Sequence, residues 1–198
     1  MTYDLFIALV TFAFVSSITP GPNNLMLMAS GANFGILRTI PHGLGVGLGF
    51  IFMIMMVGLG LAQLFDQFPV LHDVLKVVSV VYLAWLAWKI GTAAPKLGNP
   101  TQTGRPLTFW QAAAFQWVNP KAWAMALTAI TLYTPDTLGL WGVGLVAVVF
   151  GGVNVPCISC WAYLGVQLRY FLNSPQRLRL FNCTMAFLLI LSLYPIVM

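Results

Sequence analysis

Six apolar segments, separated by short polar stretches, run along the chain. Each has roughly the ~20 residues that a membrane-spanning helix requires, although the third and the last are short. The pattern therefore predicts an all-α membrane protein with six transmembrane helices. The predicted spans are Leu5–Met28, Gly43–Leu64, Val74–Ile90, Phe109–Leu132, Leu140–Leu164 and Leu180–Val197.

The first span contains a stretch that an undisturbed membrane helix rarely holds, Thr19-Pro20-Gly21-Pro22-Asn23-Asn24. Each proline lacks an N–H group, so the carbonyls of Ser16 and Ile18 lose their helical partners. In hydrocarbon, such carbonyls are tolerated only where they face protein, water or a bound ligand. We therefore predict a broken helix, of the type that surrounds the central binding site of secondary transporters.

The fourth span carries a second break, at Asn119-Pro120-Lys121. When the two halves of the chain are aligned a hundred residues apart, this break falls on Thr19-Pro20-Gly21-Pro22. Each half has three predicted spans, an odd number, so the second half must lie inverted relative to the first. The sequence thus predicts two inverted three-helix repeats, residues 1–94 and 107–198, with broken helices 1 and 4, joined by a cytoplasmic linker of residues 95–106.

The composition supports a membrane protein. Of the 198 residues, 60% are hydrophobic and only 7% are charged, whereas a soluble domain carries about 25% charged residues. The net charge of +5 does not indicate nucleic-acid binding, because the nine basic residues are scattered between apolar segments. Loops that face anionic lipid headgroups explain the charge better. We therefore expect the chain to lie in a lipid bilayer and to bind no nucleic acid.

The basic residues also predict an orientation. Seven of the nine collect at or in the first, third and fifth loops, with no acidic neighbour: Arg38, Lys89, Lys96, Arg105, Arg169, Arg177 and Arg179. The acidic residues lie before the first span or in the even-numbered loops: Asp4, Asp66, Asp73 and Asp136. The basic side is expected to be cytoplasmic, so both termini face outward. A removable signal peptide is not expected, since no basic segment precedes the first span and no cleavage site follows it.

Lys121 is a formal charge that falls deep inside a predicted span. A lysine near the middle of a bilayer is costly and is a functional candidate by default. The alternative is a structural lysine that snorkels or bonds to the break at Pro20. No Asp or Glu lies within a predicted span, so a site whose fixed charge is positive favours a substrate with a carboxylate. Because the predicted spans contain no acidic side chain, Lys121 is also the candidate to carry a coupled proton.

The polar groups around the two breaks suit a zwitterion. Amide and hydroxyl oxygens and the freed carbonyls can accept hydrogen bonds from an ammonium group. The half-helix that resumes at Asn23 would direct its positive end at a carboxylate. We therefore expect a small zwitterionic amino acid as the substrate, bound by Thr19, Pro20, Gly21, Pro22, Asn23, Asn24, Asn119, Pro120, Lys121 and Asn154.

The cysteines leave two alternatives open, a divalent-metal exporter and a membrane thiol redox relay. Cys157 and Cys160 have the spacing of a redox or metal pair, but they lie mid-helix without a third ligand nearby in the sequence. Together with Cys183 they are better explained by core packing. A metal-cation site would need carboxylates or a cluster of His and Cys. We therefore expect neither a metal nor a cofactor, and no enzymatic motif is found.

The second span offers two further features. His42, at its cytoplasmic edge, is either a surface histidine or a group that gates or carries protons. The glycine pairs Gly43/Gly47 and Gly45/Gly49 allow two helix backbones to approach closely, so they predict helix packing. The sequence leaves open whether the chain forms a homo-oligomer.

Four stretches of the chain carry a resemblance to a known protein family. They are Thr19–Asn24 followed by Gly31, Gly35 and Arg38; Tyr82–Lys89; Phe115–Trp123; and Leu168–Asn182. Together they resemble the first helix, third helix, fourth helix and last loop of the LysE/RhtB family of amino-acid exporters, over nearly the whole chain. Within the family, the chain is most similar to the branch that includes a cysteine/O-acetylserine exporter.

The resemblance implies a multi-pass protein of the bacterial inner membrane that exports amino acids or close derivatives by exchange for protons. Redox members of the wider superfamily carry cysteines beside the corresponding prolines. In this chain those positions are Thr19, Gly21, Asn119 and Lys121. The absence of thiols there disfavours electron transfer.

Overall fold

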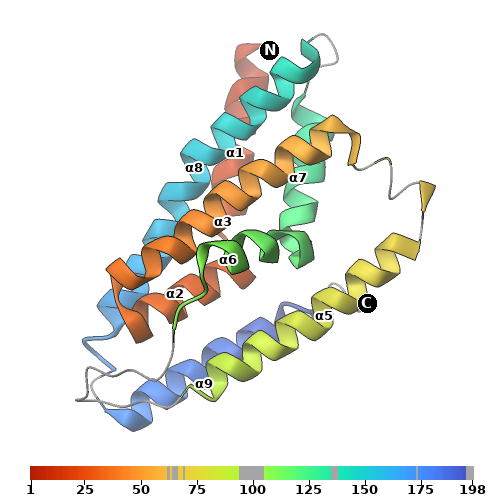
Figure 1. Cartoon of the computed structure of the whole chain (residues 1–198). Coiled ribbons are helices and arrows are strands. Elements are labelled where there is room, and N and C mark those ends of the chain that lie inside the picture. The colour runs from red at the N-terminus through yellow and green to blue at the C-terminus, as the bar shows by residue number, and fades with distance from the viewer. Residues whose placement is uncertain are drawn as a thin grey trace.

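The computed structural model describes residues 1–61, 63, 67–68, 70–93, 105–134, 138–172 and 174–194. The elements in chain order are α1 (Tyr3–Ile18), α2 (Pro22–Phe34), α3 (Ile36–Met56), the π-helical turn η1 (Val57–Leu61), α5 (Val70–Gly91), α6 (Phe109–Phe115), the 3-10 turn η2 (Gln116–Val118), α7 (Pro120–Tyr133), α8 (Gly139–Leu168) and α9 (Pro175–Leu191) (Figure 1). All of them are helical, as predicted. Most of the predicted linker 95–106 lies outside the described residues, and so do Asp66, Lys96 and Asp136.

Three of the described helical segments are long and apolar enough to cross a bilayer: Ile36–Leu61, Asp73–Gly91 and Gly139–Leu168. Helices α1 and α2 together meet the same test as one span bent by 52°. Helix α9 has only 17 residues, fewer than the ~20 that a span usually needs. The part of the chain that is described thus contains up to four spans by length and composition, and the six-span inverted repeat stays a prediction.

The first predicted break separates α1 from α2. Thr19 leaves the helix with an extended backbone (φ −64°, ψ 145°), and Pro22 takes the first position of α2, where its missing N–H costs nothing. The carbonyls freed by the two prolines are satisfied by side chains. The indole Nε1 of Trp161, on α8, donates to the Ile18 carbonyl at 3.0 Å, and the Thr19 hydroxyl donates to the Ser16 carbonyl at 3.1 Å.

The second predicted break separates α6 and η2 from α7. Helix α6 begins at a reciprocal capping box between Thr108 and Gln111, which satisfies two N–H groups of its first turn. Asn119 then interrupts the helix with an extended backbone (φ −93°, ψ 107°), and its side chain accepts the Lys121 N–H. Pro120 starts α7, so both half-helices that follow a break begin at a proline.

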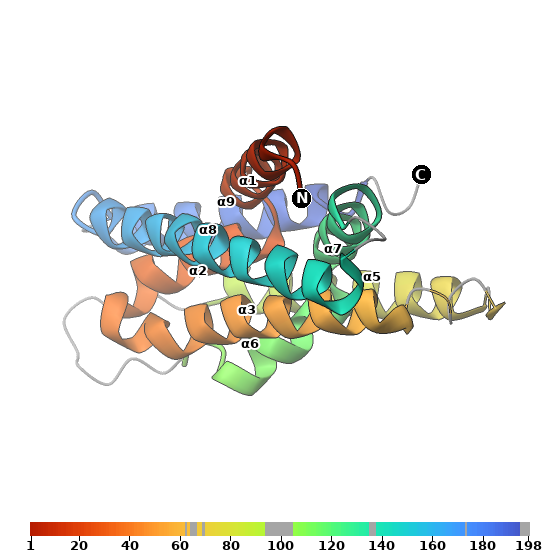
Figure 2. The ribbon, with the colours of Figure 1, turned by 90° about the horizontal axis from the view of Figure 1, so that it is seen from above.

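The helices pack in layers. Seen from above, α1 lies at one edge and α6 at the opposite edge, with the long helices α8 and α3 between them (Figure 2). Helix α2 packs against α8 and α3, and α5 lies beside α9 along one flank. Glycines permit the closest crossings. A Cβ atom at Gly31 would overlap the carbonyl oxygen of Ala162, and one at Gly165 would overlap that of Met28.

Of the two glycine pairs predicted to allow close helix contacts, Gly45/Gly49 does so, whereas a Cβ at Gly43 would meet only the Leu27 side chain, at 3.9 Å. A Cβ at Gly49 would lie 2.6 Å from the Cα of Ala113, and one at Gly45 would overlap the Phe109 carbonyl. These two glycines therefore allow α6 to approach α3 closely. Gly47 faces α8 instead.

Buried apolar side chains form two clusters. The first cluster joins α1, α3, α7 and α8, and its fully buried members include Leu9, Phe50, Met53, Ala126 and Phe150. The second cluster joins α2, α5, α6 and α9 with parts of α3 and α8, and includes Leu27, Leu83, Phe115 and Leu189. Many large apolar side chains are exposed, among them Trp88, Trp110 and Trp141. Such a surface suits lipid rather than water.

Candidate functional site

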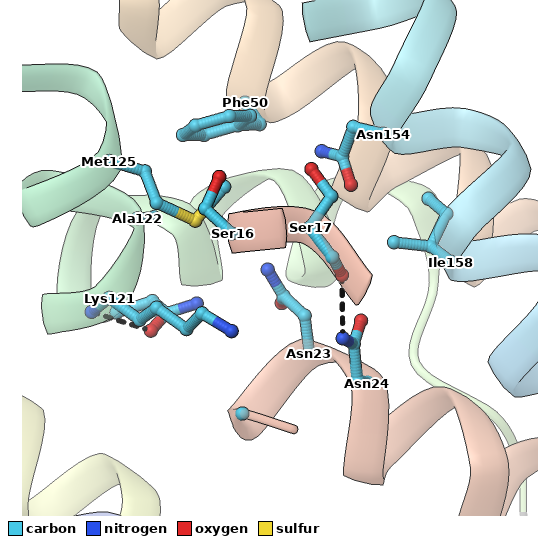
Figure 3. Close-up of a pocket in the computed structure, with 12 residues that line it drawn as sticks. Ser16, Ser17, Asn23, Asn24, Phe50, Lys121, Ala122, Met125, Asn154 and Ile158 are labelled. Atoms are coloured by element: carbon cyan, nitrogen blue, oxygen red, sulfur yellow. Dashed lines mark hydrogen bonds between the residues drawn. The ribbon is translucent and has the colours of Figure 1, made fainter. Parts of the chain in front are cut away.

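A small polar cavity lies where the break between α1 and α2 meets α3, α7 and α8 (Figure 3). It is lined by Ser16, Ser17, Gly21, Asn23, Asn24, Phe50, Asn119, Lys121, Ala122, Met125, Asn154 and Ile158. Its wall includes members of both apolar clusters, Phe50 from the first and Ile158 from the second. The cavity, called the central cavity below, therefore lies at the boundary between the clusters.

The structure brings together most of the residues predicted from the sequence. Six of the ten line the central cavity: Gly21, Asn23, Asn24, Asn119, Lys121 and Asn154. The remaining four support it. Thr19 and Pro20 supply oxygens that hold Lys121, and Pro22 and Pro120 start the two half-helices.

Lys121 connects the two breaks. Its ammonium group, in the first turn of α7, donates to the carbonyl and to the hydroxyl of Thr19, each at 2.8 Å, and is 3.4 Å from the Pro20 carbonyl. The aliphatic part of the side chain passes Gly21, where a Cβ atom would lie 2.7 Å from the lysine Cδ. Because the Gly21 backbone is extended (φ −175°), glycine is required there for space and not for conformation.

These contacts leave the charge of Lys121 without a counterion. The three acceptors are neutral oxygens, and within the described ranges no carboxylate forms a salt bridge with this lysine. The lysine is therefore a tie between α7 and the α1–α2 break in this conformation. A carboxylate would be a stronger partner than a neutral oxygen, because hydrogen bonds between two ionised groups are shorter and stronger.

Asn24 holds the break in shape. Its buried side chain donates to the carbonyls of Ser17 and Thr19, both at 2.8 Å. These bonds use its amide N–H groups, so only its amide oxygen can accept a hydrogen bond from a ligand. No side chain caps the N-terminus of α2, so the positive end of this half-helix stays available to an anion.

Asn23 forms a second link between the breaks. Its amide nitrogen donates to the Gln116 amide oxygen at 2.8 Å, and the Gln116 amide nitrogen donates back at 3.2 Å. Gln116 is fully buried and also donates to the Ala112 carbonyl. The site prediction missed Gln116, although an uncharged polar side chain inside an apolar span was the available signal. Ser16, Ser17, Phe50 and Met125 were also missed.

Two polar side chains reach into the cavity from its wall. The Ser17 hydroxyl is buried and makes no hydrogen bond in the part of the chain that is described. Asn154, which is 6% exposed, lines the cavity from α8. Figure 3 shows both groups pointing toward the same part of the cavity. A buried hydroxyl without a partner is unusual, so Ser17 is available to a ligand beside Asn154.

The central cavity is narrow in this conformation. Its volume is about 30 Å³, enough for a few water molecules at most and too small for an amino acid. The helices around it must therefore separate, or Lys121 must leave Thr19, before a ligand of that size can be held.

None of the three thiols lines this cavity. Cys157 is buried and Cys160 exposed on α8, and Cys183 is exposed on α9. Among the described residues, no group of three His, Cys, Asp or Glu side chains is placed to hold a metal ion. The arrangement thus offers no geometric support for the metal-exporter and redox alternatives.

His42 is not a surface residue, and that interpretation is wrong. Its side chain is 2% exposed, and neither ring nitrogen has a hydrogen-bond partner within the described residues. It is buried because α3 begins at Ile36, earlier than predicted, which carries His42 inside the helix packing and into the wall of a second, larger cavity.

Comparison with known proteins gives a consistent result. The model of the family described as LysE type translocator matches residues 14–192. A cysteine/O-acetylserine efflux protein of Klebsiella pneumoniae is 29% identical over 172 residues, which cover 83% of this chain and 84% of the relative. The protein of that name from Escherichia coli O1:K1 is 32% identical over 167 residues, 83% of this chain and 84% of the relative. Another, from Escherichia coli O139:H28, is 31% identical over 192 residues, 96% of each chain. No solved structure matches.

Proposed function

Because the chain belongs to the LysE type translocator family, and is therefore a transporter and not an enzyme, we propose that it exports amino acids or close derivatives from the cytoplasm. Cysteine and O-acetylserine are the first candidates, since they appear in the names of its relatives. The central cavity is the proposed binding site.

The observation that carries this proposal is the bonding of Lys121. A cation inside a membrane helix is normally paired, yet this one meets only neutral oxygens of Thr19 and Pro20. A substrate carboxylate would supply the missing negative charge. It would also face the uncapped N-terminus of α2.

The ammonium end of the substrate needs acceptors. The amide oxygens of Asn24 and Asn154 and the hydroxyl of Ser17 are the neutral acceptors that line the cavity and have room for a donor. Charge at one end and neutral acceptors at the other suit a zwitterion. Simple anions and metal cations match only part of this set.

Substrate binding and helix movement are coupled through the same contacts. A carboxylate that binds the lysine ammonium competes with Thr19, so it loosens the tie between α7 and the α1–α2 break. The proposed cycle is alternating access, in which the two inverted repeats rock about the central cavity. Exchange for protons is the proposed driving force, with Lys121 as the titratable group of the central cavity.

The proton role has its own test. Efflux driven by a pH gradient is measured in vesicles that contain wild-type protein or Lys121→Gln. Coupling is expected to be lost in the variant, because glutamine cannot carry a proton. Gradient-driven efflux of undiminished size would remove Lys121 from that role.

The export function is tested in cells fed a panel of dipeptides, which release their amino acids inside the cell. Expression of the protein is expected to lower the accumulation of its substrates, and Lys121→Gln to restore it. Lys76→Gln is the matched control, since Lys76 is exposed on α5 and lines neither cavity. Identical export by wild type and Lys121→Gln would contradict the proposed site. No effect of expression on any amino acid would contradict the function.

A further inference from the structure

A second cavity lies between α2, α3, α5 and the segment that precedes α6. Its volume of about 340 Å³ is much larger than that of the central cavity. It is lined by Met26, Ala29, Ser30, Asn33, Phe34, His42, Leu86, Lys89, Ile90, Thr92, Ala93, Arg105, Pro106 and Leu107. This larger cavity has room for an amino acid in the conformation described.

The charge of its wall is positive. Lys89 and Arg105 are both exposed side chains that line it, and none of the described lining residues is acidic. The Lys89 ammonium lies 5.2 Å from the centre of the Trp85 ring, a contact that does not neutralise its charge. A carboxylate entering this cavity would therefore meet two cations.

The rest of the described wall is mostly apolar, with Ser30, Asn33, His42 and Thr92 as its polar residues. Ser30 bonds to Thr39 at 2.9 Å, and the Asn33 amide exchanges hydrogen bonds with Asn182. Both ring nitrogens of His42, which is 2% exposed, lack a hydrogen-bond partner in the described part of the chain. An unpaired imidazole beside a cavity of this size is a group that a polar ligand can satisfy.

Helix α2 connects the two cavities. Asn23, Met26, Ser30 and Asn33 follow one another at intervals of three, four and three residues, so they form one stripe on the helix surface. Asn23 lines the central cavity, and the other three line the larger one. The Asn23–Gln116 amide pair lies on this stripe, at the end nearer the central cavity.

We propose that the larger cavity is a loading site, in which Lys89 and Arg105 bind the carboxylate of the amino acid on the cytoplasmic side before it passes along α2 to Lys121. The inference rests on the proposed function and on the predicted orientation. An anionic lipid headgroup shares the chemistry of the ligand, so the experiment separates the two sources.

The first test is kinetic. O-acetylserine uptake is measured with inside-out vesicles, and the variant carries both Lys89→Gln and Arg105→Gln. The apparent KM is expected to rise about tenfold, as for the loss of two partly exposed charge contacts, with a maximal rate within about twofold of wild type. Arg179→Gln is the matched control, because this arginine of α9 belongs to the same basic set and does not line the cavity.

Varying the lipid composition of the vesicles shows whether the two cations bind the substrate carboxylate or an anionic lipid headgroup. In vesicles of phosphatidylcholine alone, the KM increase is expected to persist, because the carboxylate comes from the substrate. An increase seen only with anionic lipid present would overturn the proposal in favour of a lipid contact. An unchanged KM, or an equal increase in Arg179→Gln, would overturn it as well.

The second test does not depend on transport. The three native cysteines, Cys157, Cys160 and Cys183, line neither cavity and are first replaced by Ser. Ala93, which lines the larger cavity, is then changed to Cys. O-acetylserine is expected to slow labelling of this thiol by a charged reagent. The protection is expected to survive Lys121→Gln and to disappear when Lys89 and Arg105 are replaced.

The outcomes separate the two proposals. Export that requires Lys121, together with no protection at position 93, would remove the loading site and leave the proposed function intact. Protection that disappears in Lys121→Gln would assign the effect to the central cavity and also overturn the loading site.

Discussion

Gly21 provides the space in which the Lys121 side chain crosses to Thr19. An added Cβ would lie 2.7 Å from the lysine Cδ and 3.2 Å from its Nζ, so Gly21→Ala must displace the ammonium group. The backbone at this position is extended and accepts alanine, and the displaced atoms belong to a flexible side chain. We therefore expect folding to be retained while the apparent KM for substrate rises about tenfold, the effect of losing one good hydrogen bond to a charged group.

The measurement compares the KM and the melting temperature in detergent with those of Gly152→Ala. A Cβ at Gly152 meets nothing within 4 Å, so this control changes a glycine to alanine without displacing a neighbour. A Gly21→Ala variant that transports with the wild-type KM would show that the position of the lysine does not matter.

Trp161 satisfies the carbonyl that the break exposes at Ile18. Its Nε1 donates to this carbonyl at 3.0 Å, and phenylalanine cannot replace the donor. Trp161→Phe is expected to lower the free energy of unfolding by ~0.5–1.5 kcal/mol, the usual range for one hydrogen bond in a membrane protein. Trp141→Phe, on the same helix but 87% exposed, is the control. Equal melting temperatures for the two variants would mean that the bond adds nothing to stability.

Helices α2 and α8 cross at a distance that only glycine allows. At Gly165 an added Cβ would overlap the carbonyl oxygen of Met28, and a backbone atom cannot move aside as a side chain can. Gly165→Ala is therefore expected to destabilise the protein by ~1–3 kcal/mol, seen as a loss of monodisperse protein in detergent. Gly144→Ala, also on α8 and without neighbours within 4 Å, should behave as wild type. A similar loss in both variants would show that the crossing at Gly165 is not its cause.

The sequence predicted the two breaks correctly, because the effect of a proline on a helix is local. Pro22 and Pro120 remove backbone donors wherever they occur, and each indeed starts a half-helix. The start of α3 was placed too late, at Gly43 instead of Ile36. Hydropathy falls at the polar residues after Ile36, but the backbone hydrogen bonds of a helix do not depend on side-chain polarity.

The sequence predicted those residues of the candidate site that are unusual for their place in the chain. Lys121 stands out as a charge in an apolar span, and Asn23 and Asn24 follow a break. Gln116 is a polar side chain in an apolar span, but its role comes from a partner 93 residues away, and such pairing depends on how the helices dock. The burial of His42 has the same origin, since it results from the packing of α3 against its neighbours, which include α2, α6 and α8.

At the scale of the molecule, the central cavity lies between two apolar clusters. The first cluster holds α1, α3, α7 and α8 together, and the second holds α2, α5, α6 and α9, with Val46 of α3 and Ile158 of α8 as further members. Helices α3 and α8 thus belong to both clusters. Apolar cores resist deformation because they are closely packed, whereas a polar boundary can exchange one hydrogen-bond partner for another. The proposed alternating access is therefore expected to begin at the polar contacts of the central cavity.

The predicted orientation can be checked without any transport assay. Fusion of alkaline phosphatase to the C-terminus is expected to give an active enzyme, because that terminus is predicted to face outward. A fluorescent protein that folds only in the cytoplasm, fused at the same position, should stay dark. Bright fluorescence and inactive phosphatase would reverse the orientation, and with it the side on which the larger cavity opens.

The central claim is that the Lys121 ammonium binds the carboxylate of the substrate. The most direct measurement is a double-mutant cycle between side chain and ligand, in which the binding of O-acetylserine and of its carboxamide is compared in wild type and Lys121→Gln. Wild type is expected to prefer the carboxylate by about tenfold to a hundredfold, equivalent to ~1.5–3 kcal/mol for a hydrogen bond to a charged group. The variant should bind both ligands equally. A preference for the carboxylate that is the same in both proteins would contradict the account.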